Sequence, residues 1–156
     1  MKVIRLFAIL VVEVLTPPAT HILHRGKSMN LNEIYEEMKQ ENNDAIAFIK
    51  SGKFYLTYEN DATIISYLFG YKKTKGKVGF PESSVKKVLS KLDENRISYA
   101  IYNGSTVLFD DNNYYSFFEE ASTDIIITGM ANELVKKIKK AIREDKSNYQ
   151  KIKVFV

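Results

Sequence analysis

The chain has 156 residues, of which 45% are hydrophobic and 27% are charged. This length allows one domain with a hydrophobic core, and the composition excludes wholesale disorder. The sequence has no cysteine, which excludes disulfides, thiol nucleophiles and thiolate metal sites. Its net charge of +4 is compatible with nucleic-acid contact but is too small to require it.

The N-terminal segment is mostly apolar over residues 3–15, as in a signal peptide, but Arg5 and Glu13 interrupt the run. The run is too short to span a bilayer, and no small-residue cleavage site follows it. We therefore expect residues 1–28 to be an extension of a cytoplasmic protein without a membrane segment. The alternatives are secretion, an extra strand packed on the core, and translation that begins at Met29.

The next segment predicts a helix followed by a β-hairpin. Apolar residues recur at i, i+3, i+4 and i+7 from Leu31 to Met38, which predicts a helix over residues 31–42. Two short apolar runs then predict strands over residues 45–50 and 53–58, with a turn at Gly52.

The middle of the chain predicts two more helices. Asp61 is expected to cap a helix that ends at Gly70, and residues 71–77 form a basic loop or edge strand. Residues 79–82, Gly-Phe-Pro-Glu, predict a turn that opens a helix as far as about Asn95.

The last third of the sequence predicts a second hairpin around Asn103-Gly104, a strong turn signal. The further expected elements are strands 99–102 and 106–109, an aromatic patch at 114–118, a strand at 125–127, a helix over 131–144 and a closing strand over 152–156. The predicted fold class is therefore α/β, a mixed sheet flanked by helices, in one domain over residues 29–156.

Catalytic chemistry has little support in the sequence. The two histidines, His21 and His24, both lie in the N-terminal segment, and adjacent carboxylate pairs are typical of solvated surface. Residues 70–78 are superficially similar to a phosphate-binding loop, but five residues instead of four separate the glycines and no serine or threonine follows the lysine. We expect no enzyme activity, no cofactor and no metal.

Three short motifs indicate a family. Residues 52–56 are Gly-Lys-Phe-Tyr-Leu, Asp61-Ala62 follow at a helix start, and Gly-Phe-Pro-Glu occupies 79–82. This order and spacing resembles the N-terminal DNA-recognition domain, domain I, of the MutS mismatch-repair family, most clearly over residues 31–102. The family pattern is Gly-x-Phe-Tyr-Glu, then acidic-Asp-Ala, then Gly-Ile-Pro or Gly-Phe-Pro. The chain keeps the motif residues quoted above, and Leu56 replaces the glutamate.

The resemblance implies a role for Phe54 as a wedge. In the family, the matching phenylalanine stacks on a mispaired base, and the glutamate two residues later hydrogen-bonds that base; Leu56 cannot make this bond. Tyr55, the neighbouring aromatic residue, is a second candidate for DNA contact. Successive side chains of a strand point to opposite faces, so one of the two rings is expected to face the core. The lysines expected to contact phosphates near the wedge are Lys53, Lys72, Lys73, Lys75 and Lys77.

The implied function is noncatalytic binding of mispaired or distorted DNA in a mismatch-repair-related role. The sequence has no Walker motif, so we expect a stand-alone domain whose protein partner supplies further activities. One alternative is a protein-interaction module that keeps the fold without binding DNA, and another is a small secreted or membrane-associated domain. A second basic surface, formed by Lys136, Lys137, Lys139 and Lys140, is explained equally by an ordinary amphipathic helix.

Overall fold

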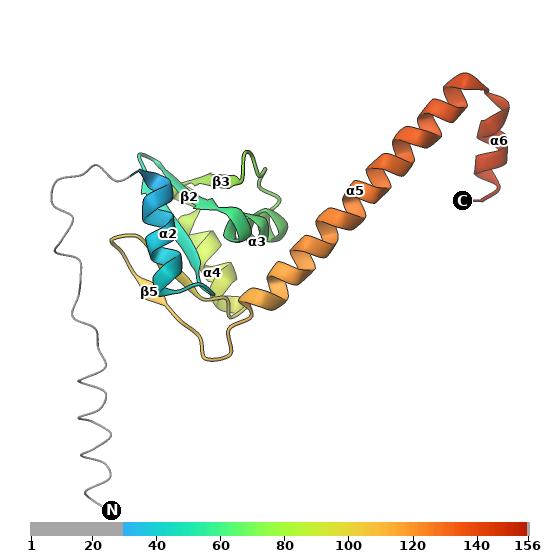
Figure 1. Cartoon of the computed structure of the whole chain (residues 1–156). Coiled ribbons are helices and arrows are strands. Elements are labelled where there is room, and N and C mark those ends of the chain that lie inside the picture. Colours follow the sequence, from blue (N-terminus) through green and yellow to red (C-terminus); the bar gives the residue numbers. More distant parts are fainter. Residues whose placement is uncertain (1–29, 156) are drawn as a thin grey trace, which may run out of the picture. The chain divides into compact units, whose positions relative to one another are not determined.

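The structure is a computed structural model that describes residues 30–155 (Figure 1). The expectations for the N-terminal extension, for His21 and His24 and for a start at Met29 lie outside the described residues. Within the described part of the chain, no helix is both long and apolar enough to cross a membrane.

The described residues alternate between helices and strands as far as β5 and are helical thereafter. The elements are α2 (Leu31–Glu41), β1 (Ile46–Ser51), β2 (Phe54–Tyr58), α3 (Glu59–Phe69), β3 (Lys77–Pro81), the 3-10 helix η1 (Glu82–Ser84), α4 (Val85–Glu94), β4 (Tyr99–Ile101), β5 (Thr106–Val107), α5 (Tyr114–Glu144) and α6 (Ser147–Lys153). The predicted first helix, both hairpins and the helix end at Gly70, which has a φ of +67°, are confirmed.

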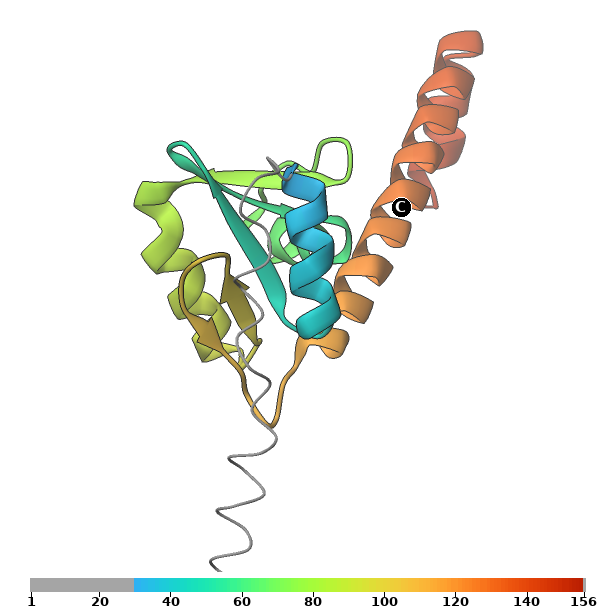
Figure 2. The ribbon, with the colours of Figure 1, turned by 60° about the vertical axis from the view of Figure 1, so that its left-hand side comes forward.

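The five strands form one mixed sheet in the order β3-β2-β1-β4-β5. β1 pairs antiparallel with β2 and parallel with β4, while β2–β3 and β4–β5 are antiparallel. Figures 1 and 2 show α2 on one face of this sheet and α3 and α4 on the other. The predicted α/β class, a mixed sheet flanked by helices, is therefore confirmed.

The largest part of the core lies between the sheet and the helices α3 and α4. Phe48 on β1 meets Phe80 on β3 edge to face, with ring centroids 5.5 Å apart, and both rings are buried. Ile64 from α3 and Leu92 from α4 complete this layer. The sequence places these residues inward because α3 and α4 each carry an apolar stripe at helical spacing.

The expected turn at residues 79–82 is wrong in detail. Gly79, Phe80 and Pro81 belong to strand β3, where Phe80 is the antiparallel partner of Tyr55. The helix starts only afterwards, as a 3-10 turn from Glu82 that continues into α4. Pairing with β2 extends this segment because it lets the Phe80 ring enter the core, a long-range gain that local turn signals do not contain.

Two predicted strands in the last third of the chain are also wrong. Residues 125–127 lie inside the 31-residue helix α5, and residues 152 and 153 end α6, with a turn at residues 154 and 155. Isoleucine runs favour strands only when a neighbouring strand edge is available for pairing, and no sheet edge pairs with these residues. The aromatic patch at 114–118 forms the start of α5.

Candidate nucleic-acid interface

The turn between β1 and β2 presents an aromatic side chain at its tip. Gly52 and Lys53 form the two-residue loop, because Ser51 and Phe54 are the last paired residues of the two strands. Gly52 has a φ of +60°, whereas Lys53 does not have a positive φ. These signs match a type II′ turn, the hairpin type that takes glycine at its first central position. The loop therefore holds Phe54 on a short, well-defined support.

The two adjacent aromatics of this hairpin point to opposite faces of the sheet. Tyr55 is half-buried and stacks on Phe80 with a centroid distance of 5.9 Å, so it belongs to the core layer. Phe54 faces the other way, across from Pro81, and 52% of its surface is exposed. The expected alternation is thus present, with Tyr55 as the core member and Phe54 as the outward ring.

Leu56 lies two residues beyond Phe54 and therefore on the same face. Its cross-strand partner is Gly79, and a Cβ added at Gly79 would lie only 3.0 Å from Leu56 Cδ2. The glycine leaves room for the leucine. Phe54, Leu56, Gly79 and Pro81 form a strip that we call the hairpin face, and it has no side chain able to hydrogen-bond a base.

Charged groups surround the tip of the hairpin. The exposed Lys53 follows Gly52, and its carbonyl accepts a 2.9 Å hydrogen bond from the Glu82 backbone N–H. The Glu82 carboxylate forms an ion pair with Lys50, and this hydrogen bond raises the pKa of the Lys50 ammonium. Lys50 therefore offsets the negative charge of Glu82, and the tip keeps the positive charge of Lys53.

The remaining predicted lysines lie at the other end of β3. Lys77 pairs with Tyr58, whereas Phe54 pairs with Pro81, so four strand residues separate Lys77 from the level of the wedge candidate. At about 3.3 Å per residue this is about 13 Å. Lys72, Lys75 and Lys77 are exposed, and we call these three residues the lysine loop. The sequence had suggested that these lysines lie near Phe54, but in the structure the lysine loop lies away from it.

Lys73 has a different environment from its neighbours. Its ammonium donates hydrogen bonds to the Glu59 carbonyl at 3.0 Å and to Thr63 Oγ1 at 2.8 Å. The side chain is half-buried and holds the loop against the start of α3. Its donors are therefore engaged within the protein, in contrast to the exposed lysine loop.

A carboxylate also lies close to the loop. The Glu59 backbone N–H donates to the Gly76 carbonyl, and a Cβ added at Gly76 would lie 2.6 Å from Glu59 Oε1. The positive φ of +76° favours glycine at position 76, whereas the Glu59 carboxylate is the end of a flexible side chain that can move aside. The Glu59 charge lowers the positive potential at the base of the loop.

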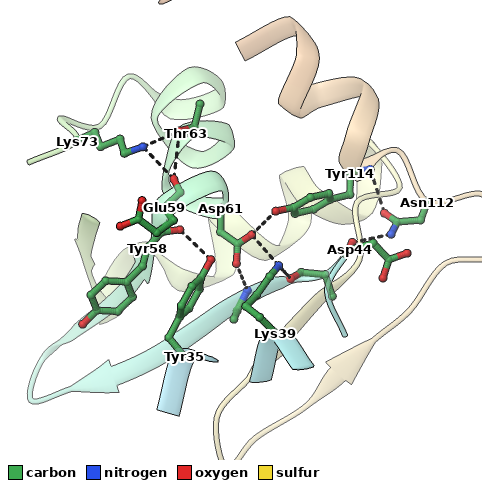
Figure 3. A network of polar contacts seen from close by, with 12 residues as sticks. Tyr35, Lys39, Asp44, Tyr58, Glu59, Asp61, Thr63, Lys73, Asn112 and Tyr114 are labelled. Carbon is green, nitrogen blue, oxygen red and sulfur yellow. Dashed lines mark hydrogen bonds and ion pairs between the residues drawn. The ribbon is translucent and has the colours of Figure 1, made fainter. Parts of the chain in front are cut away.

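Asp61 has a different role from the expected helix cap. It lies in the first turn of α3, is fully buried, and accepts hydrogen bonds from the Lys39 ammonium at 2.9 Å, the Ala47 backbone N–H at 2.9 Å and the Tyr114 hydroxyl at 2.5 Å (Figure 3). The N-cap residue is Tyr58, whose side chain makes no capping bond. Asp61 therefore connects α2, β1, α3 and α5 instead of capping its own helix.

The protonation states fit this structural role. Burial raises the pKa of Asp61, and the Lys39 ammonium, with the hydrogen bonds to Asp61, acts in the opposite direction. Burial and the nearby Asp61 charge raise the pKa of Tyr114, so its hydroxyl stays protonated and donates. We interpret the group as a paired buried charge that fixes the start of α5 on the domain.

Residues 30–106 match the family model described as MutS domain I. These residues form a MutS domain I-like domain. The match covers all five strands up to Thr106, while α5 and α6 lie beyond it. No curated protein matches the sequence.

The MutS domain I family is a noncatalytic DNA-binding family of mismatch repair, and this gives the hairpin face its context. Among residues 30–155, no group of three or more histidine, cysteine or acidic side chains is placed to hold a metal. The second basic surface, Lys136 to Lys140, lies on the exposed part of α5 and outside the family match, where Lys136 pairs with Glu133 and Lys140 with Glu144.

Sequence reasoning missed the partners of Asp61. Lys39 and Tyr114 lie 22 and 53 residues from it along the chain, and no local pattern connects such positions. A weak signal was available, because Asp61 precedes an alanine and two isoleucines that all face the core. An acidic residue at the start of a mostly apolar stretch needs a partner when it is buried.

Proposed function

We propose that the MutS domain I-like domain binds DNA without catalysis, with Phe54 as a wedge beside a base in a mispaired or distorted duplex. The observation that carries the proposal is the position of Phe54: an exposed ring next to a two-residue turn, on a strand whose next residue is anchored in the core. A ring held in this way enters a base step without first losing much conformational freedom.

The energetics favour distorted DNA over regular duplex. Stacking of an aromatic side chain on a base contributes about 1–3 kcal/mol. Unstacking a base step costs a few kcal/mol and costs least where the base is mispaired. Stacking of the Phe54 ring therefore offsets the cost of unstacking more readily at a mispair than within matched duplex.

The hairpin face limits how much base identity the domain recognises. Leu56 stands where the family pattern has a glutamate, and its neighbours Gly79 and Pro81 have no hydrogen-bonding side chain. Without a side-chain acceptor beside the wedge, specificity comes from the ease of deforming the duplex. We infer a preference for deformable sites that is largely independent of which bases are mispaired.

The phosphate contacts are divided between two places. Lys53 lies beside the wedge, and the lysine loop lies about 13 Å away along the strand direction. Successive base pairs rise about 3.4 Å, so the loop matches phosphates about four base steps from the wedge. Lys73 is left out of this set because its ammonium is bound within the protein.

The first experiment measures fluorescence anisotropy of the full chain on matched, mispaired and single-stranded DNA at two salt concentrations. Phe54→Ala is expected to weaken binding to mispaired duplex about 5- to 150-fold, the equivalent of about 1–3 kcal/mol of stacking. Tyr67→Ala is the matched control, because Tyr67 is also an exposed aromatic but lies on α3. Equal losses in the two variants would refute the wedge.

The phosphate contacts are tested by salt dependence. Replacing Lys72, Lys75 and Lys77 together by glutamine should reduce the slope of log K against log salt by up to about 2.7, if all three neutralise a phosphate. Lys73→Gln is the control and should leave the slope unchanged. A slope that the triple variant does not alter would remove the lysine loop from the interface.

The role of position 56 is tested by restoring the family residue. Leu56→Glu provides an acceptor on the hairpin face and should increase the preference for mispaired over matched duplex by about tenfold, the value of one good hydrogen bond to a base. Leu56→Gln separates hydrogen bonding from charge repulsion by phosphates. A wild-type chain that already discriminates between mispairs would contradict our inference about this position.

A protein-interaction module is the second candidate, and the loss of the glutamate at position 56 favours it. DNA binding at low salt distinguishes the two candidate functions. If the full chain binds no DNA form at low salt, where phosphate contacts are strongest, the DNA proposal fails and the interaction module remains.

A further inference from the structure

Helix α5 continues far beyond the part that packs on the domain. Ala121 is its last buried residue, and the side chains from residue 122 to residue 144 are exposed or half-buried. This distal part has about 23 residues and a length of about 35 Å at 1.5 Å per residue. It contains large apolar side chains with exposed fractions of 59% for Leu134 and 69% for Met130.

Six apolar residues of the distal part lie on one side of the helix, whereas Ile125, Ile126 and Val135 lie outside this set. Positions 127, 131, 134, 138 and 141 alternate spacings of four and three, the spacing of a coiled-coil seam. Met130 lies on the same side. We call this set the α5 stripe: Ile127, Met130, Ala131, Leu134, Ile138 and Ala141. Ile125 lies nine residues before Leu134, which places it about 180° away, on the opposite side of the helix.

The charges of α5 divide sharply along its length. From residue 114 to residue 135 the helix has four acidic residues and no lysine or arginine: Glu119, Glu120, Asp124 and Glu133. From residue 136 to residue 144 it has five basic residues and one acidic residue: Lys136, Lys137, Lys139, Lys140, Arg143 and Glu144. The two halves therefore have net charges of about −4 and +4 by formal charge.

This charge division selects the orientation of a partner helix. A second α5 packed parallel would place acidic half on acidic half and basic half on basic half. A second α5 packed antiparallel would place each acidic half along the basic half of the other copy. The helix is thus complementary to itself in the antiparallel orientation only, and such pairing is isologous and closes after two copies.

α6 covers only the end of the stripe. The Asn148 side chain donates a 3.0 Å hydrogen bond to the Ala141 carbonyl, and Ile138, Ala141 and Ile152 are half-buried. Ile127, Met130 and Leu134 remain exposed. α6 therefore leaves the rest of the stripe uncovered.

We propose that the α5 stripe pairs with the stripe of a second copy of this chain in an antiparallel arrangement centred near Leu134. In this register Ile127 lies opposite Ala141 of the other copy, and Asp124 lies at the level of Arg143 and Glu144, at the end of the basic half. The inference does not depend on DNA binding, because the stripe and the hairpin face share no residue. A membrane surface fits less well, because the acidic half of α5 would face anionic headgroups.

The absence of cysteine makes the register directly testable in the full chain. Leu134→Cys should form a disulfide-linked dimer on mild oxidation, because the two-fold axis brings the two copies together there. Ile127→Cys should not cross-link to itself but should cross-link to Ala141→Cys when the two variants are mixed. Self-cross-linking of Ile127→Cys without any mixed product would show parallel pairing and overturn the proposal.

Sedimentation equilibrium tests whether the pairing occurs without a cross-link. The wild-type chain should be dimeric, and Leu134→Glu should raise the dimer dissociation constant more than about tenfold, because it places a charge in the seam. Ile125→Glu is the matched control, since Ile125 is about as exposed as Leu134 but lies on the other side of the helix. Its dissociation constant should stay within about twofold of wild type.

Two further results would overturn the proposal. One is a wild-type chain that remains monomeric at about 100 µM, a concentration well above the dissociation constant of a specific homodimer. The other is a monomer that sediments with phosphatidylglycerol vesicles and loses this binding in Leu134→Glu, which would assign the stripe to a lipid surface. Circular dichroism of Leu134→Glu confirms that the helix is retained, so that loss of dimer is not loss of fold.

Discussion

The MutS domain I-like domain and the distal part of α5 contain the same kinds of apolar residue in opposite environments. Ile64 and Ile65 on α3 are fully buried, whereas Ile126 and Ile127 on α5 have exposed fractions of 63% and 60%. Both pairs are adjacent isoleucines in a helix. The difference arises from what covers each helix: α3 packs on β2, β3 and the start of α5, while the distal part of α5 has contacts with α6 at its end.

The comparison indicates that the two regions use apolar surface for different purposes. In the domain, burial on both sides of a sheet stabilises the fold that supports the hairpin face. On α5, apolar side chains form a separate surface, and the charges of this helix follow a pattern of their own. Large exposed apolar surfaces in soluble proteins commonly mark interaction sites. The predictions below test this division, beginning with the largest expected effect.

The connection between the two regions depends on Asp61. Asp61→Ala should reduce the free energy of unfolding by about 3–5 kcal/mol, because Lys39 and Tyr114 lose the buried carboxylate that they contact. Urea unfolding measures the change. Glu94→Ala, which removes an exposed ion pair with Lys91, should cost no more than about 1 kcal/mol. Similar losses in both variants would mean that the buried network contributes no more than a surface pair.

The burial contrast itself can be measured with two isoleucines. Ile64→Ala should reduce the free energy of unfolding by about 2–5 kcal/mol through lost burial and a cavity. Ile126→Ala should change it by less than about 0.5 kcal/mol, because the side chain is mostly exposed and lies beside the stripe. Thermal and urea unfolding of the two variants provide the comparison, and equal losses would contradict the separation of the regions.

The domain core should also respond to alkaline pH. Burial raises the pKa of Tyr99 from 10.0 to about 12. The tyrosine of the unfolded chain therefore loses its proton first, and stability falls as pH rises from 10 to 12. Tyr99→Phe should remove about 2–3 kcal/mol of this fall. Urea unfolding at pH 9 and pH 12 tests it, and parallel pH profiles for wild type and variant would refute the assignment.

The smallest expected effects come from two glycines and should have opposite signs. Gly52→Ala should cost about 1–2 kcal/mol, because its φ of +60° is unfavourable for any residue with a Cβ. Gly129→Ala should stabilise by about 0.5–1 kcal/mol, because Gly129 is helical and a Cβ there meets no atom within 4 Å. Urea unfolding of both variants gives the two signs, and stabilisation by Gly52→Ala would contradict the turn assignment.

Much of the domain could be predicted because its local signals agree with its tertiary structure. The stripe from Leu31 to Met38 predicted α2, and Gly70 ended α3 with a left-handed residue as expected. The Asn103-Gly104 pair marked the second hairpin, where Asn103 has a φ of +55°. In each case the pattern and the conformation involve neighbouring residues, so no distant contact was needed.

The candidate site could be predicted only in part. The motif over residues 52–56 predicted an outward ring, and strand alternation required one of its two aromatics to face the core. Which of them does so depends on Phe80, which stacks on Tyr55 from another strand. The separation of Phe54 from Lys77 likewise follows from the register between β2 and β3, which a linear sequence does not contain.

The sequence by itself determined the MutS-like motifs, the turns that need glycine, the amphipathic helices and the charge division along α5, because each depends on the order of neighbouring residues. Only the tertiary structure decided that residues 125–127 are helical and exposed, that Asp61 is a buried link instead of a cap, and that the lysine loop lies away from the wedge. These outcomes depend on strand pairing and on contacts between residues far apart in the chain. Such contacts override local propensity when they bury apolar surface or pair a buried charge.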